Sequence, residues 1–180
     1  HTPTRRQRQM CIRDRGKALG ATVIAAASSD DKLALCTELG ADHVINYSNE
    51  SLKDRVKELT GGAGVDVVYD PVGGDFSEPA VRSMGWNGRY LVIGFASGPI
   101  PSIPLNLTLL KGCSIVGVFW GRFTMEEPEV HLANIDNLWQ WFEEGKIEPV
   151  ITDLFPIEEY EGAYAAMVER RAKGKVILTF

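Results

Sequence analysis

From Gly16 onward, the chain alternates short runs of β-branched residues with segments of helical patterning. Strands are expected at residues 22–27, 43–45, 65–69, 90–93 and 113–118. The segments 30–39 and 52–59 follow serines that can cap a helix, and each places apolar residues on one helical face. Because consecutive parallel strands need a crossover connection that is usually a helix, the alternation predicts an α/β fold with a doubly wound parallel sheet.

Three of the expected strands end in glycine-bearing loops. These loops are Asp70–Gly74, Gly94–Gly98 and Phe119–Gly121. Open α/β sheets hold ligands at the carboxyl ends of their strands, so this edge is the predicted binding site. Asp70 is interpreted as a cap on the turn that follows it, and it is given no catalytic role because no His or Lys partner is identifiable.

The last part of the chain carries two apolar stripes at helical spacing, in residues 129–144 and 160–167. Both stripes are predicted to face the core. Prolines bracket a strand at 151–155 that is expected to leave the main sheet, and a final strand is expected at 175–178.

Composition and charge exclude several classes of function. The 180 residues fit one domain, and the net charge of −5 argues against a nucleic-acid partner. There is neither an apolar run long enough to span a bilayer nor a secretory signal, so no membrane association and a cytoplasmic location are expected. The three cysteines and three histidines lack metal-ligand spacing, which predicts no metal site.

The first 15 residues differ from the rest of the chain because they carry five arginines and no α/β pattern. Two interpretations are open. The segment is either a basic arm that binds an acidic partner or a cloning or assembly artefact joined to a truncated gene. A domain of this type is expected to have a strand and a glycine loop here.

Several motifs together resemble one known family. They are the stretches 17–21, 40–47, 67–74, 117–121 and 170–178. In this order they resemble zinc-free quinone oxidoreductases of the medium-chain dehydrogenase/reductase superfamily. The resemblance implies a Rossmann-type cofactor domain at 16–150, a segment at 151–180 that returns toward a catalytic domain outside this chain, and hydride transfer from NADPH to a quinone or an activated enone.

The chain departs from that family where the first strand and its glycine-rich phosphate-binding turn are expected, since the arginine-rich run stands there instead. We therefore expect an incomplete sheet with a seam, an inactive fragment, and weak binding of NADP(H) or none at all. An alternative is a non-enzymatic interaction module that uses the basic arm and an exposed sheet edge. In the intact protein, the resemblance implies a homodimer formed through strand 113–118.

The resemblance also assigns cofactor-binding residues. Ser29 and Lys32 follow the second strand of the family's fold, which makes Lys32 a ligand of the NADPH 2′-phosphate; otherwise they are a helix cap and a solvated lysine. Tyr47 matches a tyrosine beside the adenosine ribose, with a half-buried strand-end aromatic as the alternative.

The nicotinamide half of the cofactor is assigned to the later loops. Gly73, Gly94, Phe95, Ala96 and Ser97 match loops that pass the ribose and nicotinamide, where glycine permits close approach of the backbone. Val118, Phe119 and Trp120 match the nicotinamide-side wall, or else form an apolar strand end. Arg170 is assigned to the nicotinamide end as well, with a solvated helix-end arginine as the alternative.

These assignments predict a preference of the complete enzyme for NADPH. Replacing Lys32 by Ala should lower kcat/KM for NADPH roughly tenfold or more, because a charged hydrogen bond contributes about 1.5–3 kcal/mol, and should leave NADH almost unaffected. Steady-state kinetics with both cofactors measures the effect. An equal loss with NADPH and NADH would contradict the assignment of Lys32 to the 2′-phosphate.

Overall fold

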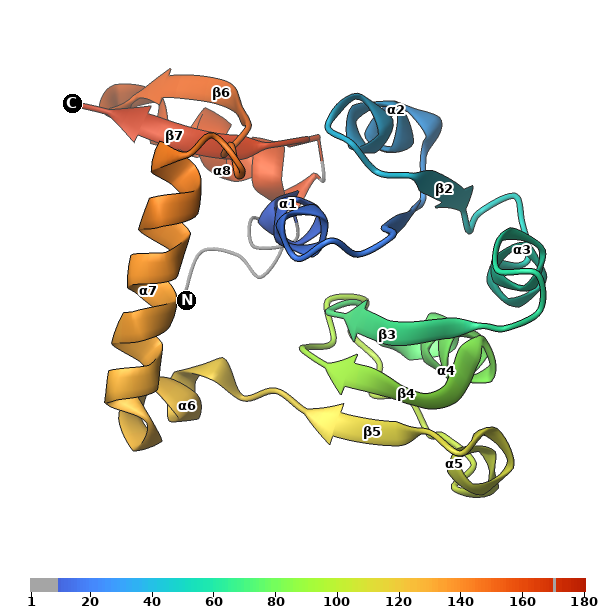
Figure 1. Cartoon of the computed structure of the whole chain (residues 1–180). Coiled ribbons are helices and arrows are strands. Elements are labelled where there is room, and N and C mark those ends of the chain that lie inside the picture. The colour runs from blue at the N-terminus through green and yellow to red at the C-terminus, as the bar shows by residue number, and fades with distance from the viewer. Residues whose placement is uncertain (1–9, 170) are drawn as a thin grey trace. The chain divides into compact units, whose positions relative to one another are not determined.

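The computed structural model describes residues 10–169 and 171–180 (Figure 1). The described residues divide into two compact units. The first unit comprises the described residues of His1–Ala25, Asp30–Val44 and Asn137–Phe180, and the second comprises Ala26–Ser29 and Ile45–Asp136. We describe each unit by itself.

The second unit is built around a three-stranded parallel sheet. Its strands, in spatial order, are β3 (Val65–Asp70), β4 (Met84–Val92) and β5 (Ser114–Gly117). Its helices are α3 (Leu52–Leu59), η1 (Gly74–Phe76), α4 (Ser77–Arg82), α5 (Asn106–Lys111) and α6 (Trp120–Glu126). The core cluster consists of Ala80, Val81, Met84, Tyr90 and Leu107. Side chains of α4, β4 and α5 thus form the core that packs against this sheet.

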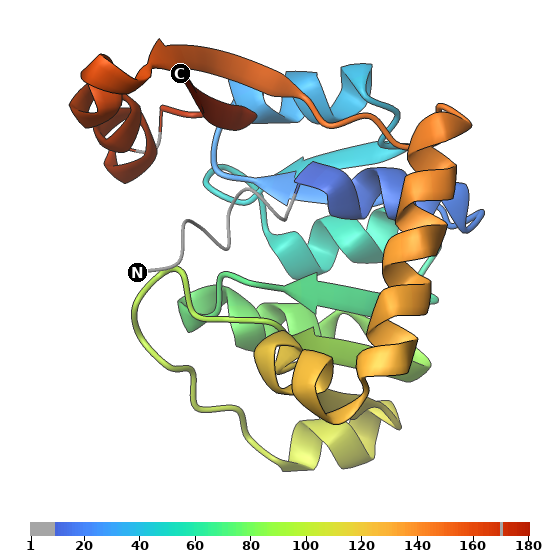
Figure 2. The same ribbon diagram turned by 90° about the vertical axis from the view of Figure 1, so that its left-hand side faces the viewer.

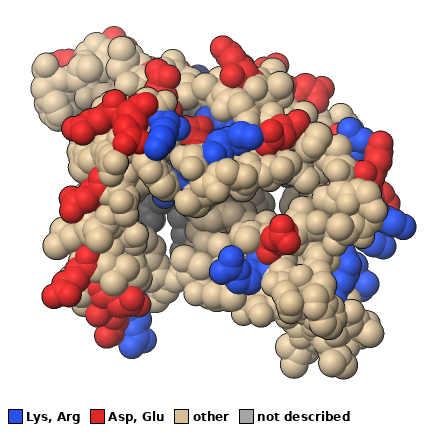
Figure 3. All heavy atoms as spheres, in the orientation of Figure 1, with Lys and Arg blue, Asp and Glu red and all other residues tan. Residues whose placement is uncertain are grey.

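The first unit contains a second parallel pair of strands. Its elements are α1 (Met10–Ala18), α2 (Asp30–Glu38), β6 (Ile151–Pro156), η2 (Ile157–Glu159), α8 (Tyr160–Val168) and β7 (Lys175–Thr179). β6 pairs with β7, and α8 lies against both strands (Figure 1, Figure 2). The ammonium of Lys17 lies 2.8 Å from the carboxylate of Asp42, which also accepts a hydrogen bond from the backbone N–H of Val23. Acidic and basic side chains are interspersed on the face drawn in Figure 3.

Three further elements pass from one unit to the other: β1 (Ile24–Ala27), β2 (His43–Asn46) and α7 (Pro128–Glu143). β1 and β2 form a two-stranded sheet that shares no strand with β3-β4-β5 or with β6-β7. The mixed α/β class with parallel strands confirms the fold expected from the sequence. The interruption between β1-β2 and β3-β4-β5 agrees with the expected seam.

Local sequence signals hold for several elements. Ser51 caps α3, and its hydroxyl accepts a hydrogen bond from the backbone N–H of Asp54, as its position predicts. β4 begins at Met84 rather than Tyr90. The sequence hides this earlier start because Gly85 and Gly88 resemble a turn, whereas in the structure their missing side chains let β4 approach the backbone at residues 63–65.

The prediction that both late apolar stripes face the core is wrong for α7 and holds only in part for α8. α7, which lies wholly within the described part of the chain, has no buried residue, and Leu132 is 61% exposed. In α8 the small residues Ala163 and Ala166 are buried, whereas Tyr160 and Tyr164 are exposed. Helical periodicity identifies an apolar face but does not say whether another element covers it.

α1 begins at Met10 and runs across the boundary expected at Gly16, and it ends before Gly20, which has a φ of 78°. Residues 1–9 of the basic segment lie outside the described residues, so its separate origin stays a prediction. Within the residues that the structure describes, no helix is both long enough and apolar enough to cross a membrane.

Two loops at the carboxyl ends of β3 and β4 are joined by backbone hydrogen bonds. We call them the 71–74 loop and the 94–97 loop. The N–H of Ala96 donates to the carbonyl of Pro71 at 3.0 Å, and the N–H of Ser97 donates to the carbonyl of Val72 at 2.9 Å. The hydroxyl of Ser97 donates to the same Val72 oxygen. These bonds hold the two loops side by side.

Glycine is required where the two loops touch. Gly73 and Gly74 have φ values of 69° and 65°, which L side chains rarely adopt. A Cβ on Gly73 would lie 2.8 Å from the ring of Phe95, and a Cβ on Gly74 would lie 2.5 Å from the hydroxyl of Ser97. Glycine at these positions therefore permits close packing of one loop on the other.

Gly74→Ala should destabilise the chain by about 1–3 kcal/mol, because it adds both backbone strain and a steric clash with Ser97. Urea denaturation followed by circular dichroism measures the loss. Gly117→Ala is the matched control, because nothing lies within 4 Å of a Cβ at that position. Equal stability of the two variants would show that the contact between the loops imposes no such constraint.

Candidate functional site

The candidate site is the edge of the second unit's sheet at which β3, β4 and β5 end. The three strands are parallel, and their arrowheads in Figure 1 point to the same side. The 71–74 and 94–97 loops leave this edge, so the sheet brings together the residues that the sequence assigns to the nicotinamide half of the cofactor. From these two loops they are Gly73, Gly94, Phe95, Ala96 and Ser97.

Asp70, the last residue of β3, organises the first of these loops. One carboxylate oxygen accepts hydrogen bonds from the backbone N–H groups of Val72 at 2.7 Å and Gly73 at 3.0 Å. The other oxygen accepts from the hydroxyl of Ser77 at 3.2 Å and from the hydroxyl of Tyr90. The structure therefore confirms that Asp70 caps the turn, as the sequence predicts.

Tyr90 and Ser77 are members of this arrangement that sequence reasoning missed. Tyr90 is 3% exposed and Ser77 is fully buried. Burial and the hydrogen bond to Asp70 raise the pKa of the Tyr90 phenol, so the group remains a protonated donor at neutral pH. Tyr90 lies in an apolar strand, where an aromatic residue is expected as core, and only its hydroxyl indicates a polar partner.

The ends of β1 and β2 meet in the second unit. The N–H of Tyr47 donates to the carbonyl of Ala27 at 3.1 Å, and the hydroxyl of Ser48 donates to the carbonyl of Ser28. The ring of Tyr47 packs against Phe76 of η1 at a centroid distance of 4.3 Å. Tyr47, a residue that the sequence assigns to the site, therefore lies between two segments. One is the end of β1, which Ser29 follows in the chain, and the other is η1, which begins at the last residue of the 71–74 loop.

Lys32 lies in the first turn of α2, three residues after Ser29. Asp30 and Asp31 occupy the same turn. The carboxylate of Asp31 pairs with the ammonium of Lys173 at 3.2 Å, so one of the two acidic groups is partly neutralised within the first unit. This pairing reduces the repulsion that Asp31 would exert on a phosphate near Lys32.

The residues after β5 form an exposed apolar surface. Val118, Phe119 and Trp120 are 37%, 75% and 46% exposed, respectively. The N–H of Val118 continues the ladder by donating to the carbonyl of Val92, and the ring of Trp120 contacts His131. The predicted site residue Arg170 lies outside the described residues.

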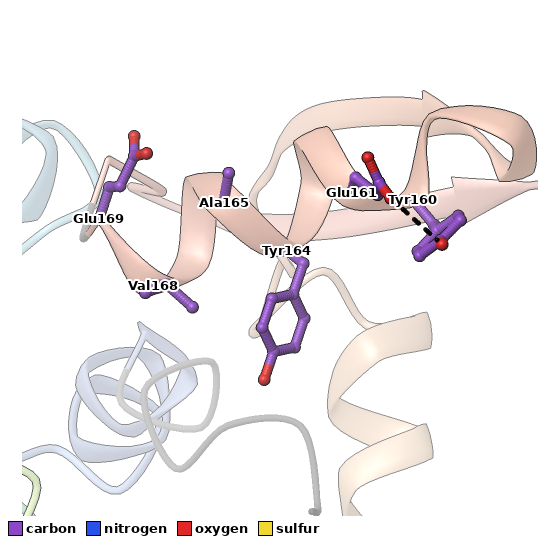
Figure 4. Close-up of a pocket in the computed structure, with 6 residues that line it drawn as sticks. All are labelled: Tyr160, Glu161, Tyr164, Ala165, Val168 and Glu169. Carbon is purple, nitrogen blue, oxygen red and sulfur yellow. Dashed lines mark hydrogen bonds between the residues drawn. The ribbon is translucent and has the colours of Figure 1, made fainter.

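A separate shallow hollow lies on α8 in the first unit (Figure 4). Tyr164 and Val168 point to one side of the helix, and Glu161 and Glu169, which also line the hollow, point to the other side. Two carboxylates disfavour a phosphate-bearing ligand. The edge of the second unit's sheet is therefore the better candidate for a nucleotide.

No group of three or more His, Cys, Asp or Glu side chains is placed to hold a metal ion among the residues that the structure describes. The candidate edge offers backbone groups, hydroxyls and an apolar surface. Such groups bind and orient an organic cofactor.

Comparison with protein families gives a match over residues 15–137 to the family described as "Zinc-binding dehydrogenase". A curated relative, quinone oxidoreductase-like protein 2 of Bos taurus, is 44% identical over 161 residues, which are 89% of this chain and 46% of the relative. Quinone oxidoreductase of Pseudomonas aeruginosa is 34% identical over 162 residues, which are 90% of this chain and 50% of the relative.

Solved structures give the same result. The Escherichia coli quinone oxidoreductase complexed with NADPH aligns with a TM-score of 0.83 at 27% identity, covering 95% of this chain and 53% of that one. A 2-haloacrylate reductase aligns with a TM-score of 0.84 at 27% identity, covering 97% and 54%. The chain spans about half the length of the relatives it matches. Since the family match covers more than half of its residues, the chain belongs to the zinc-binding dehydrogenase family, and its homologues are quinone oxidoreductase-like proteins.

Proposed function

We propose that this chain is the cofactor-binding part of an NADPH-dependent oxidoreductase that transfers a hydride to a quinone or an activated enone. The observation that carries the proposal is the pair of hydrogen-bonded loops at the carboxyl edge of β3-β4-β5, in a fold that aligns with a quinone oxidoreductase complexed with NADPH. That edge is where open α/β sheets hold nucleotides.

The adenosine half of NADPH is assigned to Ser29, Lys32 and Tyr47. No carboxylate stands at Ser28 or Ser29, where an NAD-selective domain places an acidic residue on the ribose hydroxyls. The ammonium of Lys32 supplies positive charge for a 2′-phosphate, and the pairing of Asp31 with Lys173 lowers the opposing negative charge. The Tyr47 ring, braced by Phe76, offers a flat apolar face.

The nicotinamide half is assigned to the 94–97 loop and to the apolar surface of Val118, Phe119 and Trp120. Bound NADPH supplies the hydride itself. The residues of this chain orient the ring and exclude water from it. Gly94 has no side chain to obstruct the approach of a flat ring, and the exposed side chains after β5 provide an apolar wall.

The relatives support the proposed substrate class. Their names include quinone oxidoreductases and a 2-haloacrylate reductase, which point to an electron-poor double bond as hydride acceptor. The family description names zinc, but the described residues do not fit a zinc site, so no step is assigned to a metal. The alternative of an interaction module based on the basic arm stays a hypothesis, because residues 1–9 lie outside the described residues.

The chain should bind NADPH saturably and at least about tenfold more tightly than NADH, because one charged contact to the 2′-phosphate contributes about 1.5–3 kcal/mol. Isothermal titration calorimetry with each cofactor up to millimolar concentration measures the two affinities. No heat of binding with NADPH at that concentration, or equal affinities for the two cofactors, would overturn the proposed function.

We also propose that the intact protein is a homodimer in which β5 pairs with its twofold copy. β5 is the edge strand of its sheet, and all four of its residues are exposed. An exposed apolar edge strand invites pairing with another chain, and a twofold axis closes that pairing.

The hydrogen bonding of β5 shows which residue to change. The N–H of Val118 donates inward to Val92, and N–H groups alternate in direction along a strand, so the N–H of Val116 also points inward and that of Ile115 points outward. Ile115→Pro should therefore convert the dimer to a monomer in size-exclusion chromatography while sparing the β4–β5 ladder. Ile115→Ala, which keeps the N–H, is the control. A dimer that persists in Ile115→Pro would refute this interface.

A further inference from the structure

The carboxylate of Asp70 lies within the second unit at the junction between the sheet and the two loops of the candidate site. We propose that Asp70, held in place by Tyr90, is a positioning residue for the cofactor: it fixes the 71–74 loop, and through that loop it fixes the 94–97 loop. The inference rests on the proposed function for its ligand, but its structural part stands on the geometry alone.

The first step is the anchoring of Asp70 itself. Tyr90 belongs to the buried core cluster, and its backbone pairs with Val68 in the β3–β4 ladder, so its hydroxyl has a fixed position. Ser77, fully buried at the start of α4, donates to the same carboxylate oxygen. A carboxylate has about four acceptor sites, and the four donors around Asp70 engage both of its oxygens.

The second step is the ordering of the 71–74 loop. The other oxygen of Asp70 receives the N–H groups of Val72 and Gly73. Gly73 and Gly74 follow one another at positive φ, and glycine loses more conformational freedom on folding than any other residue. Without an anchor, this glycine pair would sample many conformations. An apolar residue at position 70 would end the strand equally well but would leave both N–H groups without this partner.

The third step carries the constraint to the 94–97 loop. The carbonyls of Pro71 and Val72 accept hydrogen bonds from the N–H groups of Ala96 and Ser97, and Phe95 packs closely on Gly73. The side-chain hydrogen bonds of Asp70 go to residues 72, 73, 77 and 90. Its backbone carbonyl accepts from the N–H of Ile93, but Asp70→Ala keeps that bond, so the influence of the side chain on residues 96 and 97 passes through the 71–74 loop. A change at Asp70 that alters residues 96 and 97 is therefore a signature of positioning.

Hydrogen exchange of the full chain, measured residue by residue by NMR, tests the structural part. In Asp70→Ala the amides of Ala96 and Ser97 should exchange at least about tenfold faster, while the amide of Val118, bound to Val92 in the β4–β5 ladder, should stay protected. Asp66→Ala is the matched control, since Asp66 is an exposed carboxylate on the same strand. Unchanged exchange at Ala96 and Ser97, or equal acceleration at Val118, would overturn the proposal.

Tyr90→Phe tests the same proposal if the Asp70→Ala variant does not fold. It removes one hydroxyl from the anchor and keeps the aromatic ring in the core, so it should produce a smaller acceleration at the same two amides. Wild-type exchange at Ala96 and Ser97 in Tyr90→Phe would show that Tyr90 does not hold Asp70 in position.

A pair of ligands tests the link to the cofactor. Asp70→Ala should weaken binding of NADPH about tenfold and leave binding of adenosine 2′,5′-bisphosphate unchanged, because that ligand reaches only the residues assigned to the adenosine half. Equal loss with both ligands, or no loss with either, would overturn the positioning role. If the wild-type chain binds neither ligand, the proposed function fails, whereas the exchange experiment still decides whether Asp70 positions the loops.

Discussion

The parallel pairing of β3, β4 and β5 is the constraint on which the second unit depends. Parallel strands deliver their carboxyl ends to one edge, so the loops after β3 and β4 emerge as neighbours although they are about twenty residues apart in sequence. Backbone hydrogen bonds from Ala96 and Ser97 then join these loops, and the glycines at 73 and 74 let them touch. The result is an ordered edge made mainly of backbone groups, which suits a cofactor that performs the hydride chemistry itself.

A polar cluster of the half-buried Asp70 and the buried Ser77 and Tyr90 supports that edge from the core side. The hydroxyls of Ser77 and Tyr90 donate hydrogen bonds to one oxygen of Asp70, which offsets the free-energy cost of removing that carboxylate from water. The other oxygen faces the N–H groups of the glycine loop. The apolar surfaces of α7 and β5 contrast with this cluster because they remain exposed. The polar hydrogen bonds of this cluster thus lie where β3 and β4 end, whereas all four residues of β5 are exposed.

The sequence predicts the elements that carry local signals and fails where the outcome depends on distant contacts. The capping of α3 by Ser51 and the turn-capping role of Asp70 follow from residue types and spacing, and both hold. The early start of β4 is hidden because Gly85 and Gly88 resemble a turn until the neighbouring backbone is known. The role of Tyr90 is not predicted for a related reason, since Asp70, which accepts its hydrogen bond, is 20 residues away in the sequence. The exposed stripe of α7 shows that periodicity alone does not establish burial.

We propose that NADP(H) binds at the carboxyl edge of the second unit's sheet. Titration of NADP⁺ into the ¹⁵N-labelled chain, followed by NMR chemical shifts, tests it most directly, because every backbone amide reports its own surroundings. The largest shifts should fall on Ser29, Tyr47, the 71–74 and 94–97 loops and residues 118–120, and the amides of α8 should stay unaffected. Shifts concentrated around the hollow on α8, with none at the 94–97 loop, would contradict it.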